Sequence, residues 1–304
     1  MNKKVYCLGG TNIDVVMSTI RMPEKGESAL GENHFINQGG KGANQAIALK
    51  KLGADVVLIS AIGDDYFGKK IINSLREYDV SCQNVKIIKG ARTGVALIIL
   101  EKSTNDNYIV VDVGANNLLD FNDVKVALSQ AKKDDLFVSQ LEVKCDVVKK
   151  SLIEAKKIGL KTILNPAPID KEILGSLQYV DLLITNEIEI KALTDVNVFD
   201  LGTAKTAYAI LCNKGLKELI VTLGEKGSIY VGMSSYFIPA IKVDAVDTTS
   251  AGDAYIGALI VQLSEGNDMK KAMLYATKCS ALTVTKEGAG ISIPTKEEID
   301  DFMK

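Results

Sequence analysis

The sequence predicts an α/β protein with a doubly wound, mostly parallel central sheet, helices on both faces, and a small β-sheet lid. Three observations lead to this prediction. Short apolar runs alternate with helical patterns over residues 122–189, as expected for parallel strands joined by crossover helices. Two strand-like runs at 93–113 flank a polar turn, which is typical of a hairpin. At 246–255, small residues and two aspartates directly precede a long segment with helical apolar spacing.

The composition is that of an ordinary globular protein. Of its 304 residues, 47% are apolar, and the net charge of -2 comes with no basic stripe, so no nucleic acid partner is expected. No apolar run approaches the roughly 18 residues of a membrane span, and the amino-terminal apolar run is too short for a signal peptide. Five scattered cysteines suit reduced thiols, so we expect a cytoplasmic protein with no membrane attachment. A single histidine, His34, argues against Ser-His-Asp chemistry.

The amino-terminal segment predicts a buried strand at 5–8, closed by two glycines. Asn12 and Asp14 follow at a two-residue spacing, which places both side chains on the same side of an extended segment. Such a pair can bind adjacent hydroxyls of a sugar, and an Asx turn is the alternative. Residues 15–38 hold short β-capable runs between glycines and a proline, and they predict a flap.

A glycine-rich loop then leads into a helix that ends at Gly53, and it runs Gly39-Gly40-Lys41-Gly42-Ala43-Asn44. It is not a Walker A loop, because Lys41 is followed by Gly42 rather than by Ser or Thr. A glycine-rich loop before a helix can bring backbone N–H groups close to a ligand. The loop alone does not specify which ligand.

A strand at 56–61 and a helix at 68–78 come next, followed by strands at 93–100 and 108–113. The hairpin formed by these last two strands, together with the flap, predicts a discontinuous lid. No repeat, low-complexity tract or linker interrupts the chain. We therefore expect a single domain, residues 1–304, with a lid from about 13–38 and 92–113.

The second half alternates between helices and strands, predicted as helix 122–132, strand 136–140, helix 146–158, strand 162–164, strand 181–185 and a further helix. Ligands of doubly wound sheets bind at the carboxyl ends of the strands. The polar residues that follow the strands are therefore candidates for a site: Glu142, Asn165, Asn186, Glu187, Glu189, Thr222, Gly224, Asp247 and Asp253.

Two of these candidate groups have simpler explanations. Glu187 and Glu189 open a helix, where carboxylates complement the helix dipole. The segment 221–227 ends a strand and offers backbone N–H groups and the Thr222 hydroxyl to a nucleotide. A plain hairpin turn accounts for it nearly as well.

The turn at 246–255 predicts a helix that begins near Ala251 or Gly252 and runs to about Leu263. Its amino end would direct unpaired N–H groups at an anion, and the small residues let that anion approach. Asp253 beside such an anion site fits a base that removes a proton from a hydroxyl. Helix capping by the two aspartates is the alternative. A helix at about 268–286, a glycine-rich loop and a short terminal helix complete the chain.

The run Asp247-Thr248-Thr249-Ser250-Ala251-Gly252-Asp253 and the loop at 39–46 resemble, in the same order, the two signatures of the ribokinase (PfkB-type) family of carbohydrate kinases. The resemblance extends over the whole chain through Asn12 and Asp14, Glu142, 165–168, Asn186 with Glu189, and 222–224. It implies the ribokinase-like fold and ATP-dependent phosphorylation of D-ribose at the 5-hydroxyl, giving D-ribose 5-phosphate. It also implies Mg²⁺ with the ATP, and a homodimer formed through the β lids.

By this resemblance, Asp253 is the base, and the N–H groups of Ser250, Ala251 and Gly252 stabilise the transferred phosphoryl group. The implied sugar-binding residues are Asn12, Ile13, Asp14, Gly39, Gly40, Lys41, Gly42, Ala43, Asn44, Glu142 and Asp253. The implied ATP-binding residues are Asn186, Thr222, Leu223, Gly224, Glu225, Lys226, Gly227, Gly252, Asp253 and Thr277, with Asn186 and Glu189 near the magnesium.

The family also has a monovalent-cation site, usually filled by K⁺. The corresponding positions here are Asp247, Thr249, Thr283, Lys286, Gly288 and Ser292, several of them through backbone carbonyls. Two positions depart from many relatives: Ser250 replaces Gly or Ala, and Thr277 lies where adenine packs in some of them. The alternatives are another sugar or nucleoside kinase of this fold, for deoxyribose or fructose, and a non-catalytic sugar-binding regulator.

Overall fold

The computed structural model describes residues 3–104 and 106–302. Its main feature is a nine-stranded sheet in the order β13-β12-β11-β10-β9-β8-β1-β4-β5. The strands are β1 (Lys4–Leu8), β4 (Asp55–Gly63), β5 (Val85–Ile88), β8 (Leu136–Ser139), β9 (Lys161–Leu164), β10 (Leu182–Asn186), β11 (Glu218–Thr222), β12 (Gly227–Val231) and β13 (Ser235–Pro239). All neighbours are parallel except β11 with β12 and β12 with β13. The mostly parallel sheet is confirmed.

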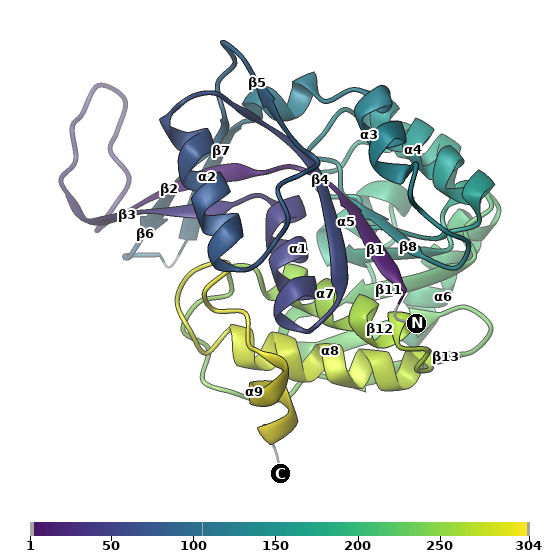
Figure 1. Ribbon diagram of the computed structural model, residues 1–304. Helices are drawn as coiled ribbons and strands as arrows, with labels where there is room; N and C mark the ends of the chain where they lie inside the picture. The colour runs from purple at the N-terminus through teal and green to yellow at the C-terminus, as the bar shows by residue number, and fades with distance from the viewer. Residues whose placement is uncertain (1–2, 105, 303–304) are drawn as a thin grey trace.

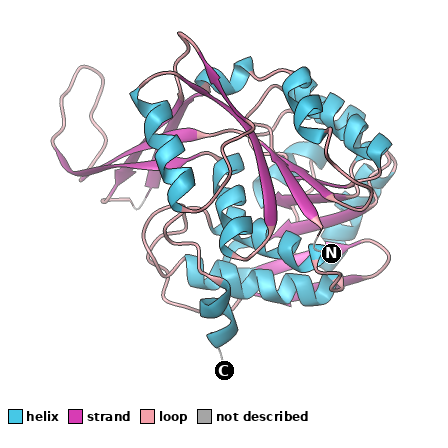
Figure 2. Cartoon of the chain, viewed as in Figure 1, coloured by secondary structure: helices cyan, strands magenta, loops and turns pink. Residues whose placement is uncertain are grey.

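Helices cover both faces of this sheet (Figure 2). One face carries α1 (Lys41–Lys51), α2 (Tyr66–Glu77), α7 (Ala251–Ser264) and α8 (Met269–Thr283), with α9 (Lys296–Asp301) after them. The other face carries α3 (Phe121–Leu128), α4 (Cys145–Ile158), α5 (Glu187–Thr194) and α6 (Leu201–Cys212). Three 3-10 helices, η1 (Gly114–Leu118), η2 (Lys171–Tyr179) and η3 (Gly224–Lys226), lie in connections.

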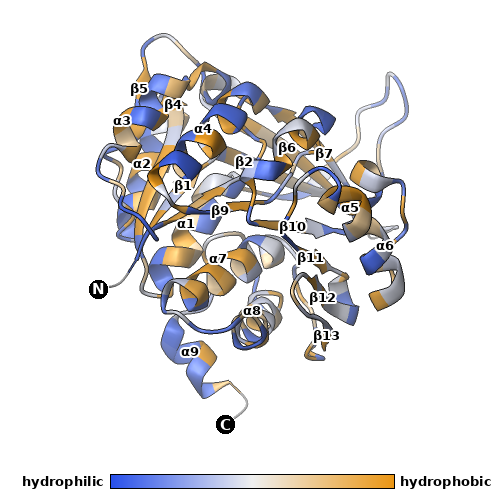
Figure 3. Cartoon of the chain, turned by 90° about the vertical axis from the view of Figure 1, so that its right-hand side faces the viewer, coloured by the Kyte–Doolittle hydropathy of each residue, from blue (hydrophilic) through white to orange (hydrophobic). Residues whose placement is uncertain are grey.

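The two faces follow from the alternation of side chains along a strand. In β1, Val5 and Cys7 belong to the core under α1 and α7, whereas Tyr6 and Leu8 belong to the core under α3 and α4. Figure 3 shows the same distribution in the helices, because α7 is largely hydrophobic whereas α9 at the surface is largely hydrophilic. A helix that is apolar nearly all round is buried, so α7 is fixed on several sides.

A second sheet of four strands, in the order β3-β2-β6-β7, projects from the body in Figure 1. Its strands are β2 (Asn12–Thr19), β3 (Gly31–Gly39), β6 (Gly94–Glu101) and β7 (Asp106–Asp112). The predicted lid from two separate pieces of sequence is therefore present as a sheet, and the expected flap forms two regular strands. Asn105, in the predicted hairpin turn, lies outside the described residues.

Some predicted boundaries were wrong. The helix expected at 122–132 ends at Leu128, and the helix expected at 268–286 ends at Thr283. In the latter, the chain turns through 283–286 and Val284 offers its carbonyl to the N–H groups of Val246 and Asp247. No helix among the described residues combines the length and apolar character needed to cross a membrane. The five cysteines are free, and the single-domain division and the cytoplasmic location stay predictions.

Candidate active site

The glycine-rich loop joins β3 to α1 and lies against the end of β1. Gly40 has a φ of 89°, and a Cβ added there would lie 2.7 Å from the backbone nitrogen of Asn12. Only glycine fits both the left-handed backbone and this close approach. The loop therefore places Lys41, the first residue of α1, beside the start of β2.

Asn12 and Asp14 lie in β2 rather than in an Asx turn, so they share one face of the strand. The Asn12 side chain is buried and its Oδ1 accepts a hydrogen bond from Nδ2 of Asn116 at 2.8 Å, which leaves its amide N–H groups for a ligand. Asp14 packs against Gly39, where an added Cβ would lie 2.1 Å from Oδ2. Burial and then the nearby Asp253 charge raise the pKa of Asp14 to about 6.

Glu142 follows β8 and points into the same space. Its Oε2 accepts a hydrogen bond from the backbone N–H of Lys41 at 2.6 Å, which joins the glycine-rich loop to the end of the central sheet. Burial raises the pKa of Glu142 to about 7, although the neighbouring Lys41 charge and N–H act to lower it. This contact brings one of the predicted strand-end residues to the glycine-rich loop.

Asp253 does not cap the helix that contains it. Its Oδ2 accepts a hydrogen bond from Nδ2 of Asn44 at 3.2 Å, and its Oδ1 accepts one from Nε2 of Gln45 at 3.0 Å. The carboxylate is buried where α7 packs against α1. Capping is thereby excluded for Asp253, and the carboxylate is held in one orientation from the side of the glycine-rich loop.

Gln45 is the site residue for which sequence reasoning assigned no role, although it stands next to Asn44. It accepts a hydrogen bond from Gln140 through its Oε1 at 2.5 Å, so a chain of two glutamines leads from β8 to Asp253. The only signal in the sequence was its place in the family motif. A helical position directly after Asn44 gives no reason to expect a contact with residue 253.

The Lys41 ammonium interacts electrostatically with three carboxylates of the site. The charge of Asp253, followed by those of Glu142 and Glu189, raises the pKa of Lys41, whereas burial opposes the increase. Burial also raises the pKa of Glu189. One ammonium thus faces several carboxylates, so a polyphosphate can approach only with additional cations. Such hard oxygen donors suit a divalent ion like Mg²⁺.

The amino end of α7 has the properties of an anion site. Ser250 has a φ of 60° and no side chain caps the helix, while the buried Ser250 Oγ has no hydrogen-bond partner among the described residues. A Cβ added at Gly252 would meet nothing within 4 Å, so open space lies beside this residue of the first turn. The Ala251 N–H donates to the Thr248 carbonyl at 3.2 Å, so an anion would compete with that bond.

The expected nucleotide residues lie on neighbouring strands. Asn186 ends β10 and pairs in register with Thr222 at the end of the parallel strand β11. Asn186 and Glu189 form a capping box, in which Asn186 Oδ1 accepts from the Glu189 N–H and Glu189 Oε2 accepts from the Asn186 N–H. Residues 222–227 form the hairpin turn into the antiparallel strand β12, and their contact with a nucleotide stays a prediction.

Thr277 is the residue expected near adenine. It is buried in α8, where its hydroxyl donates to the Met273 carbonyl at 2.8 Å. Its side chain is therefore used within its own helix, and its contact with adenine stays a prediction.

The predicted cation residues come from two segments that the fold joins. Asp247 Oδ2 accepts from the Gly288 N–H at 2.9 Å and Oδ1 from the Thr249 N–H at 2.8 Å. The Lys286 side chain pairs with Glu298, and the Thr283 hydroxyl donates to the Cys279 carbonyl. The Lys286 ammonium is thus paired elsewhere, whereas the Asp247 carboxylate and the backbone carbonyl oxygens of these segments remain as candidate ligands. These are ligands that fit a hard cation.

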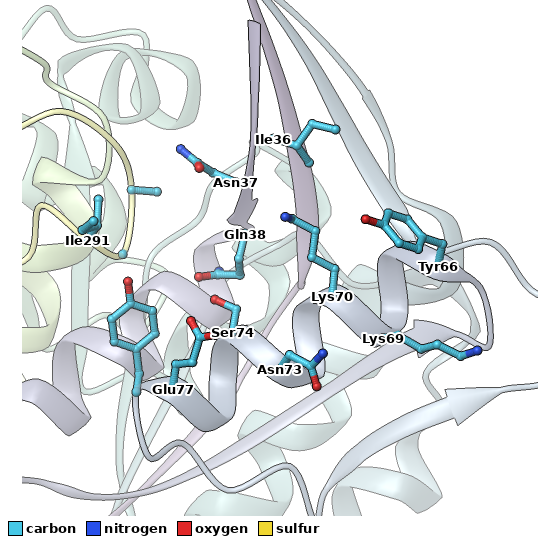
Figure 4. A pocket seen from close by; sticks show the side chains of 13 residues that line it. Ile36, Asn37, Gln38, Tyr66, Lys69, Lys70, Asn73, Ser74, Glu77 and Ile291 are labelled. Carbon is cyan, nitrogen blue, oxygen red and sulfur yellow. The ribbon is translucent and has the colours of Figure 1, made fainter.

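A cavity of about 520 Å³ lies next to this site and is not lined by Asp253. It is bounded by β3, α2 and the loop at 289–291, and Figure 4 shows Lys70 and Gln38 pointing into it. Gln38 also donates to Asn44 Oδ1 at 3.2 Å. Lys41 and Glu142 do not line this cavity either.

Comparison with known proteins agrees with this fold. A family model described as pfkB family carbohydrate kinase matches residues 2–296. The chain is 36% identical to a ribokinase of Haemophilus influenzae over 308 residues, covering 100% of this chain and 99% of the relative. It is 33% identical to a deoxyribokinase of Salmonella typhi, covering 98% of each. The structure of Arabidopsis thaliana ribokinase complexed with ribose and ATP matches with a TM-score of 0.89 at 28% identity, covering 100% and 99% of the two chains.

Proposed function

Since the chain belongs to the pfkB family of carbohydrate kinases, we propose that it transfers the γ-phosphoryl group of ATP to the 5-hydroxyl of D-ribose. Curated relatives named ribokinase share 36% and 38% identity with it across nearly its whole length. The observation that carries the proposal is the fixed Asp253 carboxylate, held by Asn44 and Gln45 next to the free amino end of α7.

The sugar is held by the polar groups that meet around Lys41. Asn12 and Asp14 of β2, together with Lys41, Asn44 and Glu142, offer donors and acceptors to ribose hydroxyls, and backbone groups of 39–43 line the same loop. The lid strands β2 and β3 carry part of this set, so sugar binding and lid position are coupled. Holding the 5-hydroxyl against Asp253 supplies the proximity that a phosphoryl transfer needs.

Asp253 then accepts the proton of the 5-hydroxyl as its oxygen attacks the γ-phosphorus. The N–H groups of Ser250 and Gly252, and that of Ala251 once its bond to Thr248 yields, face the negative charge on the transferred group. Fixed donors aimed at developing charge lower the barrier without reorganisation. Lys41 offsets part of the negative charge of the nearby carboxylates, and the cations that accompany ATP offset the rest.

The nucleotide lies on the ends of β10 and β11. Asn186, Thr222 and the turn at 223–227 offer amide, hydroxyl and N–H groups there. The triphosphate of the ATP reaches Gly252 at the amino end of α7. A divalent metal accompanies the ATP, and Asn186 and Glu189 are the residues we assign to Mg²⁺, directly or through its water. Such an ion would neutralise charge on the phosphate oxygens.

We further propose a K⁺ site between Asp247 and the loop after α8. Its ligands would be oxygens of Asp247, Thr249, Thr283, Lys286, Gly288 and Ser292. The proposal is supported by the hydrogen bond from the Gly288 N–H to Asp247, which joins the two segments that carry these residues. A cation there adds positive charge next to the amino end of α7.

A homodimer through the lid is the third part of the proposal. The lid strands expose large apolar side chains that a second copy would cover: Met17, Phe35, Leu97, Tyr108, Ile109, Val110 and Val111. β7 is exposed along its entire length. An exposed strand with such side chains is a ready site for pairing or packing with another chain.

A sugar panel tests the function. ATP consumption is measured with ribose, deoxyribose and fructose for the wild type and Asp253→Asn. We expect the highest kcat/KM with ribose, and a loss of about 10²–10⁴ in kcat for Asp253→Asn with little change in ribose affinity, as for removal of a general base. A preference for deoxyribose would reassign the substrate. Ribose binding without turnover of any sugar would favour the non-catalytic regulator.

A further inference from the structure

Lys51, the last residue of α1, lies against the loop that follows the predicted cation ligands. Its Nζ donates to the carbonyl oxygens of Gly290 at 3.0 Å, Ile293 at 2.5 Å and Ile291 at 3.4 Å. An ammonium has three N–H donors, so each of them has a carbonyl partner here. The Tyr78 ring lies on another side of the same ammonium, 5.3 Å from ring centroid to Nζ.

The loop at 288–293 makes few other hydrogen bonds to the body, although Ala289 and Ile293 are buried and Ile293 belongs to the core on this face. Gly288 donates to Asp247, and Ser292 bonds back to the Ala289 carbonyl through its N–H at 3.2 Å and its hydroxyl at 2.7 Å. On the outer side the loop borders the cavity of Figure 4, where Ile291 stands at the edge and is 69% exposed. Lys51 is therefore the side chain of α1 that holds this loop by hydrogen bonds, in addition to the apolar packing of Ile293.

The helix that carries Lys51 also carries the sugar-side residues. Lys41, Asn44 and Gln45 occupy the first turns of α1, and residues 42–49 are buried. Ten residues along a helix span about 15 Å with fixed orientation. The helix thus joins the Asp253 region at one end to the 288–293 loop at the other.

We propose that Lys51 is a positioning residue for the monovalent-cation site, because it holds the carbonyl groups of 290–293 and so keeps Gly288 and Ser292 in place relative to Asp247. This inference rests on the cation site proposed above. The positive charge of Lys51 by itself would repel a second cation. Removal of the Lys51 side chain should therefore lower K⁺ affinity if Lys51 positions the site. It should raise K⁺ affinity if Lys51 only repels the cation.

The test compares Lys51→Met with Lys51→Arg and with Lys50→Met. Lys50 is the adjacent residue of the same helix, and its side chain has no hydrogen bond or ion pair among the described residues. Two quantities are measured. One is the melting temperature without substrates in potassium chloride against tetramethylammonium chloride at equal ionic strength. The other is the K⁺ concentration that gives half-maximal kcat.

We expect the wild type and Lys50→Met to be stabilised by K⁺ to the same extent. Lys51→Met should lose this stabilisation and need about tenfold more K⁺, with the ribose KM at saturating K⁺ within twofold of wild type, and Lys51→Arg should recover most of the response. If Lys51→Met does not fold, Lys51→Gln replaces it, because glutamine keeps an amide donor and lacks the charge.

An unchanged or lower K⁺ requirement in Lys51→Met or Lys51→Gln would overturn the inference. A wild type that ignores K⁺ in both measurements would remove the cation site itself, and the inference with it. Kinase activity and its dependence on Asp253 are measured separately with the sugar panel, so failure of the cation site and failure of the kinase assignment are distinguishable.

Discussion

Gln45 holds Asp253 from a helix that lies more than 200 residues earlier in the chain. Its Nε2 donates to Oδ1 of Asp253 at 3.0 Å, and its Oε1 accepts from Gln140. The carboxylate proposed as the base thus has a fixed orientation, since Asn44 holds its other oxygen. The orientation of the proposed base therefore depends on the packing of α1 against α7.

Replacing Gln45 with Leu removes one donor from Asp253 while keeping a side chain of similar size. We expect kcat to fall about tenfold, because the carboxylate is less well oriented toward the hydroxyl, with the ribose KM within threefold of wild type. Steady-state kinetics measures both. Gln45→Glu is the matched variant and should lose more, since it places a second carboxylate against Asp253. Wild-type kcat in Gln45→Leu would show that Asn44 alone suffices.

The stability of the ligand-free protein should depend on Glu142 near neutral pH. Burial raises the pKa of Glu142 to about 7 from 4.5. Between these values the folded protein keeps a proton that the unfolded chain releases, so the free energy of unfolding falls as pH rises through this range. The loss is complete above the folded-state pKa. Asp14, with its pKa raised to about 6, adds to it in the same direction.

Glu142→Gln removes this titration and keeps an acceptor for the Lys41 N–H. We expect the variant to gain on the order of 2 kcal/mol over the wild type at pH 8, and to have no advantage at pH 4. Urea unfolding at a series of pH values measures the difference. A difference that stays constant from pH 4 to 8 would show that Glu142 does not titrate in this range.

Ser250 combines a left-handed backbone with a buried hydroxyl that lacks a partner. Ser250→Gly should raise the free energy of unfolding by about 1 kcal/mol, because it removes the backbone strain and the unpaired hydroxyl. The greater backbone entropy of glycine in the unfolded chain offsets part of this gain. Ser250→Ala keeps the strained backbone and should gain less. Both variants keep the N–H group, so kcat should stay within about threefold. A tenfold loss of kcat in both would assign the hydroxyl a role in the reaction.

The two faces of β7 give matched variants for the proposed dimer. Ile109 and Val111 point to one face, and Tyr108 and Val110 to the other. Because a dimer through the lid sheet covers one face, we expect one of the two double Lys substitutions to dissociate it and the other to leave it intact. Sedimentation velocity reports the mass. A monomeric wild type, or dimers in both variants, would contradict dimerisation through this sheet.

Much of the fold was predictable because its signals are local. Helical and strand-like apolar spacing from 122 to 189 predicts the parallel sheet, and the two glycine-containing motifs stand out locally. Asn12 and Asp14 are candidates mainly through the family resemblance. Local signals did less well at helix ends. The end of α8 at Thr283 depends on the pairing of Val284 with residues 246–247, which no local pattern contains.

The sequence by itself determined which elements form, since apolar periodicity and glycine positions act over a few residues. It also determined the set of polar residues available for chemistry. Only the tertiary structure decided how they are used. The packing of α1 against α7 brings Gln45 to Asp253, and the fold of the terminal loop brings Gly288 to Asp247 and the loop carbonyls to Lys51. These contacts join residues 40 to more than 200 positions apart, a separation at which only packing, and no local preference, selects the partner.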